Sequence, residues 1–250
     1  MAKFYRYSAF QMLCDGIPQN KVALRVNDIL NYTKNFFSRL LNLTIGLFLY
    51  ALGIVITMKA SVGFAPWEVF QAGIAKTIGL SIGLVSIFVG FIIIIAVKIL
   101  GEQIGFGTIL NMLLIGIFMD LIIYIDVIPK FGSIFYCLVQ LIAGLFTISV
   151  GSYFYIKTAF GAGPRDSLMV ALARRTRIPV GICRSLIELS VTFFGWLLGG
   201  MVGIGTVISV IGIGFCIQIT FRIFRFNVTA VKHESFKDTF DGLRGNGATA

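Results

Sequence analysis

The sequence is poor in charged residues. Only 13% of its 250 residues are charged, whereas 57% are hydrophobic, and the mean hydropathy is +0.92. A soluble domain carries about twice that charged fraction, so the composition excludes an ordinary soluble protein. Histidine occurs once, and the four cysteines show no paired spacing. These shortages argue against a metal site or a disulfide framework and favour cysteines buried as small hydrophobic residues.

Sequence motifs of common enzyme classes are also missing. The chain has no zinc-protease helix, no phosphate-binding P-loop and no nucleophile elbow. We expect no cleavable signal peptide, because the first apolar run begins only at Leu40. The sequence therefore predicts no catalytic residue, no metal and no cofactor, and it predicts that the protein is not an enzyme.

Long apolar runs are what the sequence has instead. Four runs carry no charged residue at all: Leu40–Met58, Ser81–Val97, Phe131–Ile156 and Met201–Phe221. Two further runs carry one acid each: Ile104–Ile125 and Ser185–Met201. A helix of roughly 20 apolar residues crosses a bilayer core of about 30 Å. We therefore predict an all-α membrane protein with six transmembrane helices.

The positive charge of the chain is unevenly distributed. The net charge is +10, and if the N-terminus is cytoplasmic, 18 of the 21 lysines and arginines fall on the inner side. Only Lys59, Lys76 and Lys130 then face outward. This bias matches the positive-inside rule, so it predicts a multi-pass protein of the bacterial plasma (inner) membrane with both termini cytoplasmic. The basic residues are expected to meet anionic lipid, not nucleic acid.

An internal repeat organises the chain. A shift of 98 residues aligns Gly46–Ile123 with Gly144–Phe221 without a gap, and it keeps glycine, proline, lysine and acidic positions in register. Each copy contains a Gly-x-x-Pro corner, "GFAPWE" or "GAGPRD", followed by about 15 residues, which rise only about 22 Å as a helix and do not cross a membrane. Each repeat thus has three spans, and an odd number inverts the second copy.

The predicted organisation has four parts. They are a cytoplasmic N-terminal segment 1–39, a first three-span repeat 40–125, a second, inverted three-span repeat 131–221 and a cytoplasmic C-terminal tail 222–250. Each repeat is expected to contain a short helix after its corner, either re-entrant or interfacial.

The two corners are the first candidate site. Interrupted helices in corresponding positions of inverted repeats are typical of secondary transporters and line the substrate site. A structural role, as the start of a helix lying on the membrane, is the alternative. The candidate substrate-binding residues are Gly63, Pro66, Trp67, Glu68, Gly161, Gly163, Pro164, Arg165 and Asp166. Arg165 can hold a carboxylate or phosphate, which suits a zwitterion or organic anion; alternatively it pairs with Asp166 or with lipid headgroups.

Polar residues inside spans are the second set of candidates, because they are costly in lipid. Glu188 either forms an i,i+4 ion pair with Arg184 or serves as a coupling carboxylate. Asp120 aligns with Gln218 in the second repeat, and both either face the repeat interface or cap helix ends. Asn111 is expected to be a packing amide or a site residue.

Several stretches resemble a known family. "ASVGFAPWEVF", "GFGTILNMLLIGIFMDL" and "AFGAGPRDSLMVALARRT" are similar to the YczE-type bacterial integral membrane proteins, which are distantly related to the YitT group. The resemblance runs from about Thr44 to Phe221. It departs mildly from the family at Phe64-Ala65, more often Leu-Gly, and at Glu68, usually Asp. It implies a compact helical membrane domain of transporter or permease type and supplies no substrate.

The sequence therefore predicts a secondary transporter that moves a small polar or anionic metabolite, with its site at the two corners. The alternative is a membrane sensor or assembly partner that moves nothing and acts through its basic loops and tail. Expected partners are the small-molecule substrate and membrane lipids, and glycine-rich faces allow a homodimer.

Overall fold

The computed structural model describes residues 19–228, 231 and 233–243. The chain divides into two compact units, Met1–Arg39 with Lys237–Ala250, and Leu40–Phe236. The candidate residues all lie in the second unit, to which the following paragraphs refer. Cys14 lies outside the described residues.

The described elements are all helices, without a strand among them. The long helices are α2 (Gln19–Lys59), α4 (Ile82–Ile99), α5 (Phe106–Ile125), α6 (Ile134–Lys157), α8 (Val180–Leu197) and α9 (Ile204–Ile223), and the short ones are α3 (Pro66–Ile78), α7 (Pro164–Thr176) and α10 (Phe236–Leu243). Six helices are long and apolar enough to cross a membrane, counting Thr33–Lys59 of α2 and the five other long helices. The predicted all-helical membrane class with six spans is confirmed.

Two helix boundaries differ from the sequence prediction. The first helix begins by Gln19 rather than at Leu40, because residues 19–39 contain neither proline nor glycine to stop it. The fifth span begins at Val180, not at Ser185, because Pro179 occupies the N-cap position and the helix runs on from there. Charged Arg184 therefore belongs to α8.

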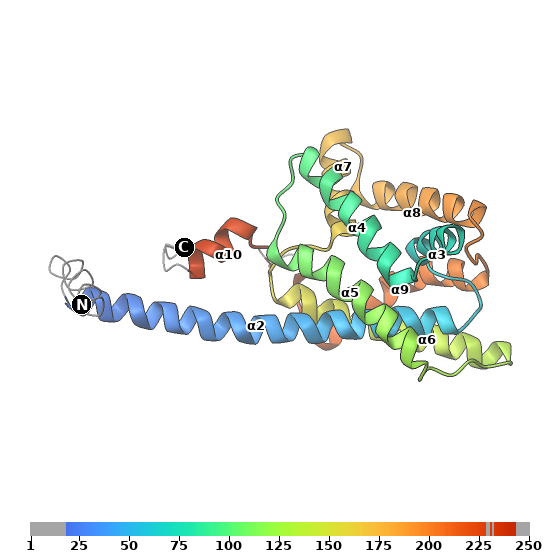
Figure 1. The fold of residues 1–250 in the computed structure, drawn as a ribbon, viewed down its shortest axis with the longest axis horizontal. Coiled ribbons are helices and arrows are strands. Elements are labelled where there is room, and N and C mark those ends of the chain that lie inside the picture. The colour runs from blue at the N-terminus through green and yellow to red at the C-terminus, as the bar shows by residue number, and fades with distance from the viewer. Residues whose placement is uncertain (1–18, 229–230, 232, 244–250) are drawn as a thin grey trace, which may run out of the picture. The chain divides into compact units, whose positions relative to one another are not determined.

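Helix bounds recur at the spacing of the sequence repeat. The shift of 98 residues carries the bounds of α3 onto α7, of α4 onto α8 and of α5 onto α9, and it carries the end of α2 onto the end of α6. Figure 1 shows α3 beside α8 and α4 near α7. The short helix of each half therefore contacts a long helix of the other half: α3 contacts α8, and α7 contacts α4.

Helices α2 and α6 cross closely at glycines. A methyl group on Gly46 would lie 3.0 Å from the carbonyl oxygen of Gly151, and one on Gly53 would lie 2.8 Å from that of Gly144. The earlier residue of α2 meets the later residue of α6, so the two helices run antiparallel. Small residues at such a crossing let helix backbones approach in a membrane.

Each corner packs on the start of a long helix from the other half. Gly63 has φ 118° and Gly161 has φ 126°, a conformation that glycine adopts without strain. The amide of Gly205 at the start of α9 donates a 2.8 Å hydrogen bond to the carbonyl of Val62. The amide of Gly107 at the start of α5 donates an equal bond to Phe160. These reciprocal bonds hold both corners between the halves.

The two halves differ in one packing contact. Between α4 and α5, a methyl group on Gly83 would collide with the carbonyl oxygen of Gly116. The equivalent glycines of α8 and α9, Gly181 and Gly214, have nothing within 4 Å of such a methyl group. Helices α4 and α5 are therefore packed together at a place where α8 and α9 are apart.

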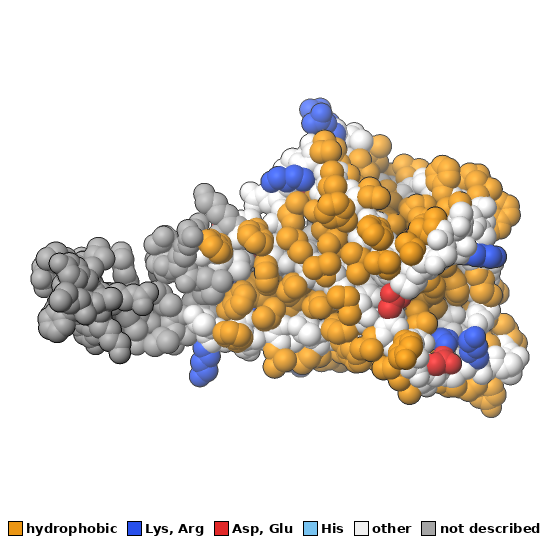
Figure 2. All heavy atoms as spheres, viewed as in Figure 1, with side chains coloured by type: hydrophobic (Ala, Val, Ile, Leu, Met, Phe, Trp, Pro, Cys, Tyr) orange, Lys and Arg blue, Asp and Glu red, His pale blue; other side chains and the backbone are white. Residues whose placement is uncertain are grey.

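The outside of the unit is apolar. Hydrophobic side chains cover most of the face seen in Figure 2, and the basic side chains lie mainly toward its margins. Exposed side chains such as Phe91, Ile92 and Phe215 suit contact with lipid tails. Cys137, Cys183 and Cys216 are buried and free, as the sequence predicts.

Candidate functional site

The site is built on the first turns of α3 and α7. Each helix begins with proline at its first position, after a residue with extended backbone. Proline has no N–H to lose there, and the acids Glu68 and Asp166 sit in the first turn, where the helix dipole favours negative charge. Side chains at this point of both helices lie between the halves, because the corners are held there.

An ion pair joins the two corners. Arg165 donates a 3.0 Å hydrogen bond to Glu68, whose side chain is only 6% exposed. The guanidinium carbon of Arg165 also lies 4.9 Å from the centre of the Trp67 ring, within cation–π range. Arg165 thus pairs with the acid of the other corner rather than with neighbouring Asp166. The sequence could not choose this partner, because it is 97 residues away.

A second ion pair stands beside the first. Arg184 donates a 2.8 Å hydrogen bond to Glu188 one turn further along α8. This is the i,i+4 pair that the spacing indicates. Asp166 accepts a 3.0 Å hydrogen bond from the hydroxyl of Tyr155 on α6. Within the described residues, Asp166 has no basic side chain within ion-pair distance.

Two small cavities meet at this cluster. One has a volume of about 100 Å³ and the other of about 70 Å³. Both are lined by the same central residues, namely Tyr50, Trp67, Arg165, Arg184 and Glu188. The larger also touches the second corner, Gly163–Asp166, and the smaller touches the first corner, Ala65–Glu68. Each cavity therefore extends along one corner and touches one residue of the other, Trp67 or Arg165.

The walls of the two cavities correspond through the sequence repeat. Asn111, Met112 and Ile115 of α5 line the larger cavity. Their counterparts at the 98-residue shift, Ser209, Val210 and Ile213 of α9, line the smaller one. The cavities are thus equivalent places in the two halves, and the central residues line both of them.

Three buried polar atoms at the cavities make no hydrogen bond. They are the indole nitrogen of Trp67, the amide oxygen of Gln71 and the hydroxyl oxygen of Ser209. Gln71 donates its amide nitrogen to Ser86 at 3.2 Å, so only its oxygen is left over. A buried polar atom without a partner is costly, and such an atom beside a cavity can bind a ligand or water. The larger cavity therefore offers one spare donor, on Trp67, and one spare acceptor, on Gln71.

Sequence reasoning missed part of this site. Tyr50, Tyr155 and Gln71 were not among the candidate residues. Gln71 carried a usable signal, since it lies one turn beyond Glu68 on the same face of the predicted short helix. The tyrosines carried none, because a tyrosine in an apolar span is equally compatible with simple packing, and Tyr155 lies in an aromatic run, Tyr153–Tyr155.

Other predicted residues lie elsewhere. Asp120 caps α4, accepting hydrogen bonds from the hydroxyl of Ser81 and, at 2.8 Å, from the amide of Gly83. Gln218 is exposed. Of the four intramembrane candidates, Glu188 and Asn111 line cavities. Among the described residues, no group of three or more His, Cys, Asp and Glu could hold a metal ion.

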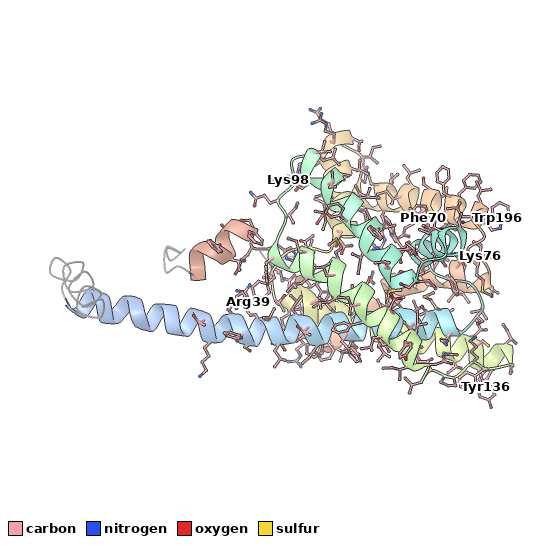
Figure 3. The ribbon with its side chains drawn as sticks, viewed as in Figure 1. Arg39, Phe70, Lys76, Lys98, Tyr136 and Trp196 are labelled. Carbon is pink, nitrogen blue, oxygen red and sulfur yellow. The ribbon has the colours of Figure 1, made fainter. Side chains whose placement is uncertain are left out.

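The contact of α3 with α8 fixes the short helix from outside the cavities. A methyl group on Gly195 would lie 2.5 Å from the backbone of Phe70, and Figure 3 shows Phe70 and Lys76 of α3 next to Trp196 of α8. A methyl group on Gly73 would lie equally close, at 2.5 Å, to the carbonyl oxygen of Gly195. The position of Trp67 and Glu68 thus depends on how α8 lies.

Comparison with known proteins gives the family. A family model described as a family of unknown function, DUF6198, matches residues 37–222. The chain belongs to this family. Similar proteins include an uncharacterized protein of Haemophilus influenzae, 33% identical over 72% of this chain and 84% of the relative. The uncharacterized membrane protein YczE of Bacillus subtilis is 30% identical over 70% of this chain and 81% of its own.

The matched region covers both corners and all the cavity residues. The YczE-type resemblance found in the sequence is therefore confirmed. No solved structure matches the chain significantly. Neither the family nor these relatives carry a described activity, so the function must be argued from the site.

Proposed function

We propose that the protein is a secondary transporter that moves a small polar metabolite across the bacterial inner membrane by alternating access. The observation that carries this proposal is the pair of equivalent cavities that share one polar centre. A substrate bound at Arg165 and Trp67 touches both cavities. Access from the two sides of a membrane to one central site is what such a transporter requires.

The proposal includes two inverted repeats. Three spans in each half favour opposite orientations of the halves, and the antiparallel crossing of α2 with α6 at Gly46–Gly151 supports this arrangement. The distribution of lysine and arginine supports cytoplasmic termini. The two corners then approach the centre from opposite sides.

The difference between the halves supports a two-state mechanism. In inverted-repeat transporters, one half closes while its counterpart opens. Here α4 and α5 touch at Gly83 and Gly116, whereas Gly181 and Gly214 face open space. We infer a second state in which α8 closes on α9 at Gly181 and Gly214 while α4 and α5 separate. Glycine at all four positions allows both closures.

Cross-linking tests this second state. Cysteines at Gly181 and Gly214, in a background whose four native cysteines are replaced by serine, should form an intramolecular disulfide under mild oxidation in membranes. A disulfide requires Cα atoms within about 7 Å, so it reports the closed approach of α8 and α9. The two single-cysteine variants control for links between molecules. Failure of the double variant to cross-link would rule out the proposed closure.

Transport itself is tested in proteoliposomes. A thermal-shift panel of amino acids, sulfonates, vitamins and organic acids should give a ligand whose effect is lost in Arg165→Ala. At 100 times its Kd, a ligand stabilises the folded protein by about 2.7 kcal/mol. That ligand should exchange across the vesicle membrane with the wild type and not with Arg165→Ala. Binding without exchange would favour the alternative function, a sensor or assembly partner.

A further inference from the structure

The basic groups at the cavities are already neutralised. Arg165 is paired with Glu68 and Arg184 with Glu188. A simple anion that bound either arginine would add a second negative charge beside a cation that a buried carboxylate already balances. A buried charge without an opposite charge to compensate it is strongly unfavourable. The cavities are therefore poorly suited to a ligand that carries only negative charge.

One carboxyl group remains available. Asp166 lines the larger cavity, and its partner there is the neutral hydroxyl of Tyr155. Gln71, whose buried amide oxygen makes no hydrogen bond, lines the same cavity. A carboxylate and a spare carbonyl oxygen are both acceptors, and an ammonium group offers three donors. The aromatic rings of Tyr50, Trp67 and Tyr155 complete surroundings that suit a cation.

Donors for an acidic group lie in the same cavity. Arg165 uses one N–H group on Glu68, and a guanidinium group has five. The indole N–H of Trp67 is buried and makes no hydrogen bond. A carboxylate or sulfonate can accept from both without separating Arg165 from Glu68, provided that its own positive charge compensates Asp166.

We propose that the substrate is a small zwitterion with one carboxylate or sulfonate group and one ammonium group, the first bound by Arg165 and Trp67 and the second by Asp166 and Gln71. This inference rests on the proposed function and narrows its substrate class. The sequence of the corners suits either a zwitterion or an organic anion, and this inference selects the zwitterion. The cavity of about 100 Å³ limits the ligand to a few heavy atoms beyond its two charged groups.

Matched probes test the charge requirement. β-Alanine and taurine are the zwitterions; propionate and ethanesulfonate supply the acidic half alone, and propylammonium and ethylammonium the basic half alone. Thermal shift and calorimetry on the detergent-purified full chain should show binding by at least one zwitterion and at least about tenfold weaker binding by both of its halves, the loss expected for one charge-assisted contact.

Two variants assign the halves of the site. Asp166→Asn should weaken the zwitterion at least about tenfold and leave its acidic half unchanged or bound more tightly, because the excess acid is gone. Arg165→Gln should weaken the zwitterion and spare the basic half. Arg175→Gln, an exposed arginine on the same helix, is the matched control and should behave as the wild type.

The outcomes separate this inference from the proposed function. Binding of acidic probes that equals or exceeds that of their zwitterions overturns the zwitterion and leaves the transporter intact. Binding of no probe of any class also overturns it; the disulfide between positions 181 and 214 then decides whether the transporter proposal survives. A zwitterion whose affinity is the same in Asp166→Asn contradicts the assigned site.

Discussion

Arg165 and Glu68 form a 3.0 Å ion pair that ties α7 to α3 across 97 residues of sequence. Both residues belong to the first turns of helices that begin with proline, so the pair joins the two corners. Its energetic and functional consequences can be separated by substitution.

Removing one partner of the ion pair should destabilise the protein more than replacing both partners by apolar residues. Arg165→Met alone should lower the free energy of unfolding by about 3 kcal/mol, because it leaves Glu68 buried without its cation. Arg165→Met with Glu68→Met should be less destabilised than that single variant. Unfolding in detergent by denaturant, with all variants in one double-mutant cycle, measures this coupling.

A pair whose arginine is exposed provides the control for that cycle. Arg174, whose side chain is 71% exposed, contacts Glu102 at 2.9 Å. Arg174→Met should change the unfolding free energy by less than about 1 kcal/mol. Equal losses at Arg165 and Arg174 would contradict a special role for the pair between the corners.

The corner glycines should tolerate no side chain. A methyl group on Gly63 would lie 2.6 Å from the amide nitrogen of Gly203, in addition to the strain of φ 118°. We expect Gly63→Ala to lower the melting temperature well beyond Gly79→Ala, where φ is also positive but nothing lies within 4 Å. The left-handed backbone at Gly79 alone costs an alanine about 1–2 kcal/mol, so the additional loss at Gly63 reports the clash together with the greater strain of φ 118°.

Equivalent glycines of the two halves should respond differently to alanine. Gly83→Ala should destabilise this state by about 2 kcal/mol, because the methyl group meets the backbone of Gly116. Gly181→Ala should be almost neutral, because its surroundings are open. Thermal unfolding of both variants checks the contrast, and equal losses would show that α8 already packs on α9 as α4 packs on α5.

The pH dependence of one loop contact follows from a lowered pKa. A hydrogen bond from the ammonium group of Lys59, and then its charge, hold the pKa of Asp126 below its ordinary value of 3.8. A carboxyl group with a lowered pKa in the folded state stabilises it above the unfolded pKa and loses this contribution as pH falls through the folded one. The wild type should thus melt higher than Lys59→Met near neutral pH.

That difference should shrink below about pH 4 and vanish once Asp126 is protonated. Asp126→Asn provides the control, because a Lys59→Met substitution in that variant should have the same small effect at every pH. A melting difference in the aspartate protein that persists under acid conditions would assign the effect of Lys59 to packing instead.

Local features of the sequence predicted much of the fold. Apolar runs gave the six spans because burial in a bilayer demands some 20 uncharged residues in succession. Helix starts at Pro66 and Pro164 followed from proline and glycine, whose backbone preferences hold without any tertiary contact. The N-terminal part of α2 was not predicted, because charged residues were used to mark the end of the apolar span. Charged residues end a membrane span but do not end a helix.

The site followed from the sequence only in part. The shared corner pattern brought Arg165, Trp67 and both corner acids into consideration before any contact was known. Asp120 shows the limit: a carboxyl group in a span looks functional, yet here it caps α4. Whether such an acid belongs to a functional site or caps a helix depends on which helix packs against it.

By itself, the sequence determined the helices, their breaks and their repetition, because hydropathy and the backbone preferences of proline and glycine act over a few residues. Only the tertiary structure decided that Arg165 meets Glu68, that the two cavities share one centre, and that Gly83 is packed while Gly181 is open. Those facts depend on how helices that are separated by tens of residues to about a hundred residues of sequence pack together. Glycine fits both the packed and the open arrangement of two helices. The residue type at these positions therefore does not decide which pair of helices is in contact.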